Sequence, residues 1–223
     1  MANQRHVVLR GFLTETEQQE LVKESIACHV RNEDKATDWD GVATSTSSLK
    51  FRLGIDCGES LEGCLPLATE LSRKAFLRAS EQMGGCKTLD DLGADAPLTG
   101  LVLLYGPKGS MSPHYDSPTQ PGQRQEWLAM MTVGNPVDFV CNDQVLTLQS
   151  GDALVMDSMA VLHGVKAILP ISGETARHKL PIEGSRLGVL LWQGKSIVGE
   201  TSASIPTLEG GLENLFGDDE DSD

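Results

Sequence analysis

The stretch "LTGLVLLYGPKGSMSPHYD", residues 98–116, marks the point at which the character of the chain changes. It begins as an apolar run of the β type, continues into a turn rich in Gly, Pro and Ser, and ends on His114 and Asp116. If its last part is extended, residues two apart point to the same side, so the imidazole and the carboxylate face one volume. That pair is compatible with an ion pair, a catalytic dyad or two-thirds of a metal site.

The sequence around this stretch predicts an α+β, mainly β fold with a jelly-roll core and N-terminal supporting helices. Thr14 and Glu17 have the spacing of a capping box in a helix over 13–30, and Pro66 begins a second helix over 66–83. The polar segment 31–54 is expected to be a long loop or a loose hairpin. Short β-type runs separated by turn signals lie at 7–12, 98–106, 126–134, 137–142, 144–149, 152–157, 160–169 and 186–194.

Length, charge and cysteine usage narrow the class of protein. The 223 residues predict one globular domain over 1–213, followed by an acidic, disordered tail over 214–223. A formal charge of −14 argues mildly against non-specific nucleic-acid binding. No run of about 18 apolar residues and no secretion signal is present, so we expect a cytoplasmic or nuclear protein away from membranes. The five cysteines are odd in number and lack a C-x-x-C pair, which favours reduced thiols.

A third candidate ligand lies downstream, where His163 stands in the apolar run that follows the turn "SGD". His114, Asp116 and His163 together supply two imidazoles and one carboxylate. This is the facial triad of non-haem Fe(II) oxygenases, which leaves coordination positions open for a co-substrate and O₂. The alternatives are a surface histidine paired with a carboxylate and a core histidine that is simply hydrogen-bonded.

Arg186 is a further candidate site residue. It is the one charged residue in the otherwise apolar run "RLGVLLWQG". An unpaired buried cation is very costly, so an arginine in such a strand needs an anionic partner. A dicarboxylate co-substrate would provide one with bidentate geometry.

With these motifs in order, the segment 98–195 resembles the catalytic core of the AlkB-like Fe(II)/2-oxoglutarate-dependent dioxygenases. The resemblance rests on "YGPKGSMSPHYD" at 105–116, on "SGDALVMDSMAVLHGV" at 150–165 and on "SRLGVLLWQGK" at 185–195. The opening "VVLRGFLTETEQQELV" is also similar to the first strand and helix of that family. The resemblance implies a double-stranded β-helix fold with O₂ as oxidant and ascorbate as a supporting reductant.

The resemblance also implies roles for individual residues. His114, Asp116 and His163 would bind Fe(II), Tyr105 and Arg186 would hold the distal carboxylate of 2-oxoglutarate, and Ser158 is a further co-substrate candidate. The chain departs from the family pattern at three positions. Leu103 and Gly188 stand where the family has asparagine, and Trp192 stands where it has a second arginine near the co-substrate.

The substrate is left open between classes. One hypothesis is oxidative demethylation of an alkylated base in RNA or DNA, stacked on Trp39 or Tyr115. Another is the same hydroxylation chemistry on a protein side chain or a small metabolite, which the acidic body favours. A third hypothesis, from a different class, is a metal-binding jelly roll without turnover, for which Trp192 in place of arginine is the only support.

Overall fold

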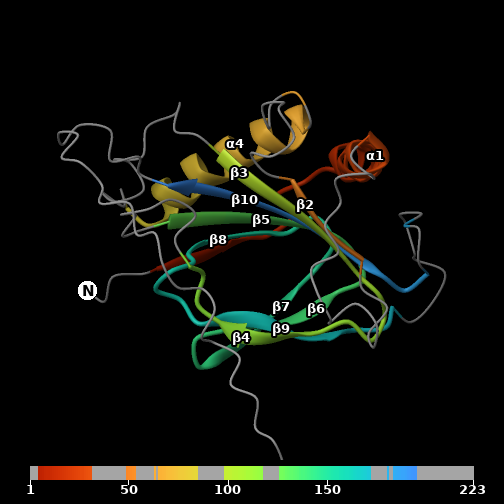
Figure 1. The fold of residues 1–223 in the computed structure, drawn as a ribbon. Coiled ribbons are helices and arrows are strands. Elements are labelled where there is room, and N and C mark those ends of the chain that lie inside the picture. Colours follow the sequence, from red (N-terminus) through yellow and green to blue (C-terminus); the bar gives the residue numbers. More distant parts are fainter. Residues whose placement is uncertain are drawn as a thin grey trace, which may run out of the picture.

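The computed structural model describes residues 5–31, 49–53, 63, 65–84, 98–117, 126–171, 180 and 183–194. They form two helices and two antiparallel sheets (Figure 1). In chain order the elements are β1 (His6–Leu9), α1 (Glu15–Arg31), β2 (Leu49–Leu53), α4 (Pro66–Gln82), β3 (Leu98–Tyr105), β4 (Met111–His114), β5 (Glu126–Gly134), β6 (Val137–Cys141), β7 (Gln144–Leu148), β8 (Ala153–Asp157), β9 (His163–Ile168) and β10 (Arg186–Gly194).

The order of the strands confirms the jelly-roll core with supporting helices. The large sheet has the order β1-β8-β5-β10-β3-β2 and the small sheet the order β4-β9-β6-β7. From β3 to β10 the chain crosses between the two sheets at almost every connection, and only β6 and β7 follow each other in one sheet. This repeated crossing places strands that are neighbours in sequence in opposite sheets, which defines the double-stranded β-helix.

Alternation along the strands of the large sheet separates two apolar layers. Leu187, Val189 and Leu191 of β10 face the helices, whereas Leu190 faces the small sheet, as the period of two requires. The layer between the sheets contains the buried residues Leu103, Tyr105, Leu128, Met130, Val137, Phe139, Cys141, Leu148, Leu154, Met156, Val161, Val165, Ile168 and Leu190. We call this layer the inner core; the candidate site described below lies at its edge.

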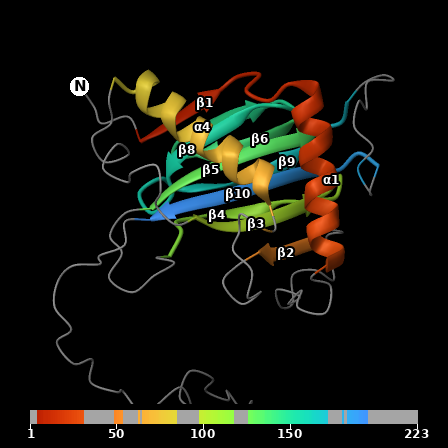
Figure 2. The same cartoon turned by 90° about the horizontal axis from the view of Figure 1, so that it is seen from above.

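Helices α1 and α4 cover the outer face of the large sheet (Figure 2). The predicted capping box forms at the start of α1: the Thr14 amide donates to Glu17 Oε2 at 2.8 Å, and the Glu17 amide donates to Thr14 Oγ1 at 3.2 Å. Leu65 precedes α4 and has no side-chain cap of its own. Instead, Glu24 of α1 accepts hydrogen bonds from the Leu67 and Ala68 amides, so one helix caps the other.

Several strand boundaries differ from the sequence prediction; β1, expected over 7–12, is His6–Leu9. Part of the segment 31–54, expected to be a long loop or a loose hairpin, is strand β2, which pairs with β3 and places Phe51 opposite Val102. The residues before His114 form the short strand β4, and β9 begins at His163 rather than at residue 160. The start of β9 at His163 follows from two hydrogen bonds of the preceding residue, Leu162. The side-chain oxygen of Asn142 accepts from the Leu162 amide, and the Asn142 amide donates to the Leu162 carbonyl.

Two further properties bear on the sequence predictions. Cys28 and Cys141 are buried, and the other cysteines lie outside the described residues. No helix in the described part of the chain is both long and apolar enough to cross a membrane. The predicted tail 214–223 and Trp39 also lie outside the described residues, and the extent of the domain over 1–213 stays a prediction.

Candidate metal centre

The end of β4 and the start of β9 bring the two candidate histidines together. His114 is the last residue of β4, His163 is the first of β9, and the two are register partners in the small sheet. Asp116 follows two residues after β4, and its amide donates to the Ser158 carbonyl at 3.0 Å. Ser158 stands in the connection that leads to His163, so this hydrogen bond fixes the carboxylate beside both imidazoles. Ligand atoms of the three residues lie within 4.8 Å of one another.

The hydrogen bonds of the histidines determine which nitrogen faces the centre. Nδ1 of His114 lies 2.9 Å from the Ser112 carbonyl oxygen, and Nδ1 of His163 lies 2.9 Å from the Val161 carbonyl oxygen. Because a carbonyl oxygen only accepts, each Nδ1 carries a proton. The remaining Nε2 atoms both lie 3.5 Å from Oδ1 of Asp116.

This arrangement requires positive charge at its centre. With Nδ1 protonated, a neutral imidazole presents the lone pair of Nε2, and two such lone pairs would face a carboxylate oxygen. Either a proton on each Nε2 or a metal cation removes the repulsion. A histidine whose Nδ1–H is held by a backbone carbonyl and whose Nε2 is directed inward is typical of metal ligands. The donor set therefore fits a divalent cation.

Asp116 is held as an anion by its surroundings. Burial by itself would raise the pKa of this carboxyl, but His114, His163 and Trp192 outweigh burial and hold the pKa well below its usual range. The Trp192 contribution is a hydrogen bond in which the indole Nε1–H donates to Asp116 Oδ2 at 2.7 Å. The exposed fraction of the side chain falls from 40% at His114 to 15% at Asp116 and 7% at His163, so the cluster opens to solvent beside His114.

Arg186 lies on the same inner face of β10 as Trp192, at the opposite end of the strand. It is 2% exposed, and its Nη1 donates to the Asn135 carbonyl at 3.0 Å. Its Nη2 is buried without a hydrogen-bond partner, and no carboxylate among the described residues forms an ion pair with the guanidinium. Burial lowers the pKa of Arg186 to about 9, against the opposing influence of Tyr105 and Asp152. The buried cation expected from the sequence is present, and none of the ion pairs among the described residues includes it.

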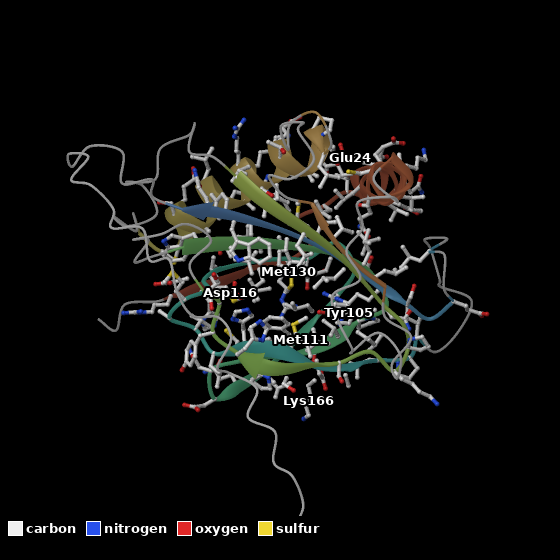
Figure 3. The ribbon with its side chains drawn as sticks, viewed as in Figure 1. Glu24, Tyr105, Met111, Asp116, Met130 and Lys166 are labelled. Atoms are coloured by element: carbon white, nitrogen blue, oxygen red, sulfur yellow. The ribbon has the colours of Figure 1, made fainter. Side chains whose placement is uncertain are left out.

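Tyr105 stands directly opposite Arg186 on the neighbouring strand β3. Residues paired in this way point to the same face, and Figure 3 shows Tyr105, Met111 and Asp116 between the two sheets. The Tyr105 side chain is buried, and among the described residues its hydroxyl donates to the weak acceptor Sδ of Met111, at 3.8 Å. Burial raises the pKa of Tyr105 above its ordinary value, so the hydroxyl is a neutral donor.

Known structures share this arrangement of strands. No protein-family model and no curated protein matches the sequence. Among solved structures, OsALKBH1 is 18% identical with a TM-score of 0.51, over 84% of this chain and 97% of that one. SnoN, a non-heme α-ketoglutarate-dependent epimerase from nogalamycin biosynthesis, is 17% identical with a TM-score of 0.52, over 86% of this chain and 79% of that one. HygX from Streptomyces hygroscopicus, solved with nickel, 2-oxoglutarate and hygromycin B, is 14% identical with a TM-score of 0.50, over 94% of this chain and 90% of that one.

This chain has the fold of the 2-oxoglutarate-dependent oxygenases. The fold expected from the resemblance to AlkB-like proteins is thereby confirmed. In this oxygenase fold the small sheet contributes both histidines, whereas the large sheet contributes Arg186, Tyr105 and Trp192.

The remaining residues singled out in the sequence take separate positions in the oxygenase fold. Ser158 is fully buried, and its carbonyl oxygen holds the Asp116 amide. Tyr115 is 57% exposed, and Trp39 lies outside the described residues.

Two of the three departures from the family pattern are register partners. Gly188 of β10 pairs with Leu103 of β3, and both lie between Arg186 and Trp192 along the sheet. A Cβ built at Gly188 would meet only Leu190 Cδ1 at 3.4 Å and the Leu103 oxygen at 3.9 Å, so the missing side chain leaves room there. Gly188 and the apolar residues Leu103 and Leu190 therefore lie between Arg186 and Trp192 on this face of the sheet.

Sequence reasoning treated Trp192 only as a missing arginine and did not find its bond to Asp116. The period of two was the signal, because residues 186, 188, 190 and 192 must share one face of β10. The period of two does not show that Asp116, which lies 76 residues earlier in the chain, contacts that face. The pairing of the two sheets decides this.

Proposed function

We propose that this chain is an Fe(II)- and 2-oxoglutarate-dependent oxygenase that hydroxylates C–H bonds. One observation carries the proposal. Two Nε2 lone pairs and a carboxylate converge at one edge of the inner core. The buried guanidinium of Arg186, whose Nη2 has no hydrogen-bond partner among the described residues, lies on the face of β10 that is turned toward the same core. Fe(II) and a dicarboxylic keto acid together would satisfy both groups. In the overall reaction 2-oxoglutarate, O₂ and R–H give succinate, CO₂ and R–OH.

His114, Asp116 and His163 would hold the iron in this reaction. Bound Fe(II) supplies the redox chemistry and the open coordination positions at which a keto acid and O₂ react. The protein fixes the donor atoms: the Ser112 and Val161 carbonyls hold the two imidazoles, and the Ser158 carbonyl and Trp192 hold Asp116. Donor atoms held in this way need little reorganisation when a metal binds.

Arg186 and Tyr105 would bind the carboxylate of 2-oxoglutarate that lies far from the metal. The free Nη2–H of Arg186 offers a charge-assisted hydrogen bond, and the neutral Tyr105 hydroxyl offers a second donor. Both groups lie in surroundings of low polarity, where such bonds are stronger than in water. The apolar inner core excludes water from the space between them and the cluster, which limits side reactions.

For the substrate we propose an alkylated base in RNA or DNA, with a small metabolite or a protein side chain as the alternative. Hydroxylation of an N-methyl group gives an N–CH₂OH product that loses formaldehyde and leaves N–H. Tyr115, which is exposed and lies between the two ligands His114 and Asp116 in the chain, offers an aromatic ring on which a base could stack. HygX was solved with the small molecule hygromycin B, which supports the alternative of a small metabolite. We place the protein inside the cell.

The test is succinate formation by the purified protein with Fe(II), ascorbate, 2-oxoglutarate and O₂, with and without N-methylated DNA and RNA oligonucleotides. We expect His114→Ala to lose essentially all turnover. Lys166→Ala, which changes an exposed residue on the outer side of the small sheet, should retain it (Figure 3). Formaldehyde released with one oligonucleotide would identify a nucleic-acid substrate. Succinate without such stimulation favours a metabolite or a protein, and metal binding without succinate favours the non-catalytic jelly roll.

A further inference from the structure

Trp192 makes a contact that its sequence position does not explain. Trp192 lies on the inner face of β10 and packs against the inner core. Its indole N–H donates to Asp116 Oδ2 at 2.7 Å. The other carboxylate oxygen, Oδ1, is the one that lies 3.5 Å from both Nε2 atoms. The two oxygens of Asp116 therefore have different partners, one in the large sheet and one in the metal cluster.

We propose that Trp192 is a positioning residue that orients Asp116 for metal binding through one oxygen. This inference rests on the proposed metal site. The indole N–H occupies Oδ2 and the Ser158 carbonyl holds the Asp116 amide, so rotation of the carboxylate is restricted at both ends. Hydrogen bonds to ligating carboxylates commonly change metal affinity by about 10- to 100-fold.

The geometry distinguishes this role from mere packing. A phenyl ring would fill most of the same volume and keep the contacts with the inner core, but it has no N–H. With Oδ2 left without its donor, the carboxylate can turn its second oxygen toward the cluster or toward water. An arginine at the same position would again offer N–H donors to Asp116.

The first experiment is a titration of the purified, metal-free protein with Co²⁺, followed by visible absorption. We expect Trp192→Phe to bind Co²⁺ about 10-fold more weakly and to change its absorption spectrum, with Trp192→Arg restoring the affinity. Trp127→Phe is the matched control, because Trp127 is also buried but lies in the layer beneath the helices. It should bind Co²⁺ like the unchanged protein.

A fluorescence measurement leaves Trp192 intact. In Trp127→Phe, Co²⁺ should quench a large part of the tryptophan emission, because Trp192 contacts a ligand of the metal. Unchanged Co²⁺ affinity and spectrum in Trp192→Phe, or no quenching in Trp127→Phe, would overturn the positioning role. If the unchanged protein does not bind Co²⁺, or if His114→Ala binds it equally well, the proposed metal site itself is wrong.

Discussion

The two faces of β10 carry different kinds of side chain. On the outer face, Leu187, Val189 and Leu191 are buried against the helices and complete an apolar layer. On the inner face, Arg186 is a buried cation with an unpartnered Nη2, and Trp192 holds a carboxylate of the candidate metal centre. The outer residues serve the apolar packing of the protein, whereas the inner ones carry a charge and a hydrogen-bond donor. Alternate residues of this strand therefore belong to the helix-facing core and to the candidate site.

Arg186→Met tests the inner face and should have the largest effect. Loss of the guanidinium leaves a bound dicarboxylate unpaired, so we expect the affinity for 2-oxoglutarate to fall by about 100-fold or more. Methionine has a similar volume and leaves no buried N–H unsatisfied, so the metal-free protein should unfold at the same temperature or higher. The measurement is thermal unfolding with and without 2-oxoglutarate and Co²⁺. A strong loss of stability in the metal-free protein, together with retained 2-oxoglutarate binding, would show that Arg186 serves stability and not ligand binding.

Leu191→Ala tests the outer face. Leu191 is fully buried beneath the helices, and its truncation should lower the free energy of unfolding by about 3 kcal/mol. The folded fraction should bind Co²⁺ and 2-oxoglutarate with unchanged affinity, because the side chain points away from the site. Urea denaturation gives the stability, and titration at low temperature gives the affinities. Weaker ligand binding without loss of stability would show that the two faces are not independent.

Glu17→Gln should have the smallest effect and concerns the helix layer alone. The Thr14 backbone and side-chain hydrogen bonds lower the pKa of Glu17, despite the opposing effect of burial. Because the folded-state pKa is depressed, its contribution is fully present above the ordinary value of 4.5 and is lost as the pH falls through the folded-state value. The variant should lose about 0.5 kcal/mol at pH 7 and almost nothing near pH 2.

Urea unfolding at both pH values measures this difference. Glu81→Gln, which changes an exposed acid near the end of α4, serves as the control and should not lower the stability at pH 7. A Glu17→Gln effect that is equal at both pH values would mean that the charge of Glu17 does not act through the capping box.

Much of the candidate site could be predicted because its parts are local. His114 and Asp116 lie two residues apart after a turn, and His163 lies in an apolar run that a turn precedes. Arg186 was recognisable as a charge in an apolar strand. The role of Glu24 as a cap could not be predicted in this way. The amides that donate to Glu24 belong to α4, and tertiary packing places α4 beside α1. The pairing of β2 with β3 was not predicted for the same reason, since β3 lies far along the chain.

The capping box, the alternation of β10 and the residue types of the candidate metal centre follow from the sequence. They depend on residue identity and backbone geometry over a few positions. The packing of distant segments sets the contact of Trp192 with Asp116, the capping of α4 by Glu24 and the burial of Arg186 with its Nη2 unpartnered among the described residues. Such contacts join segments far apart in sequence, and they form because burying both apolar layers fixes the two sheets and the helices relative to one another.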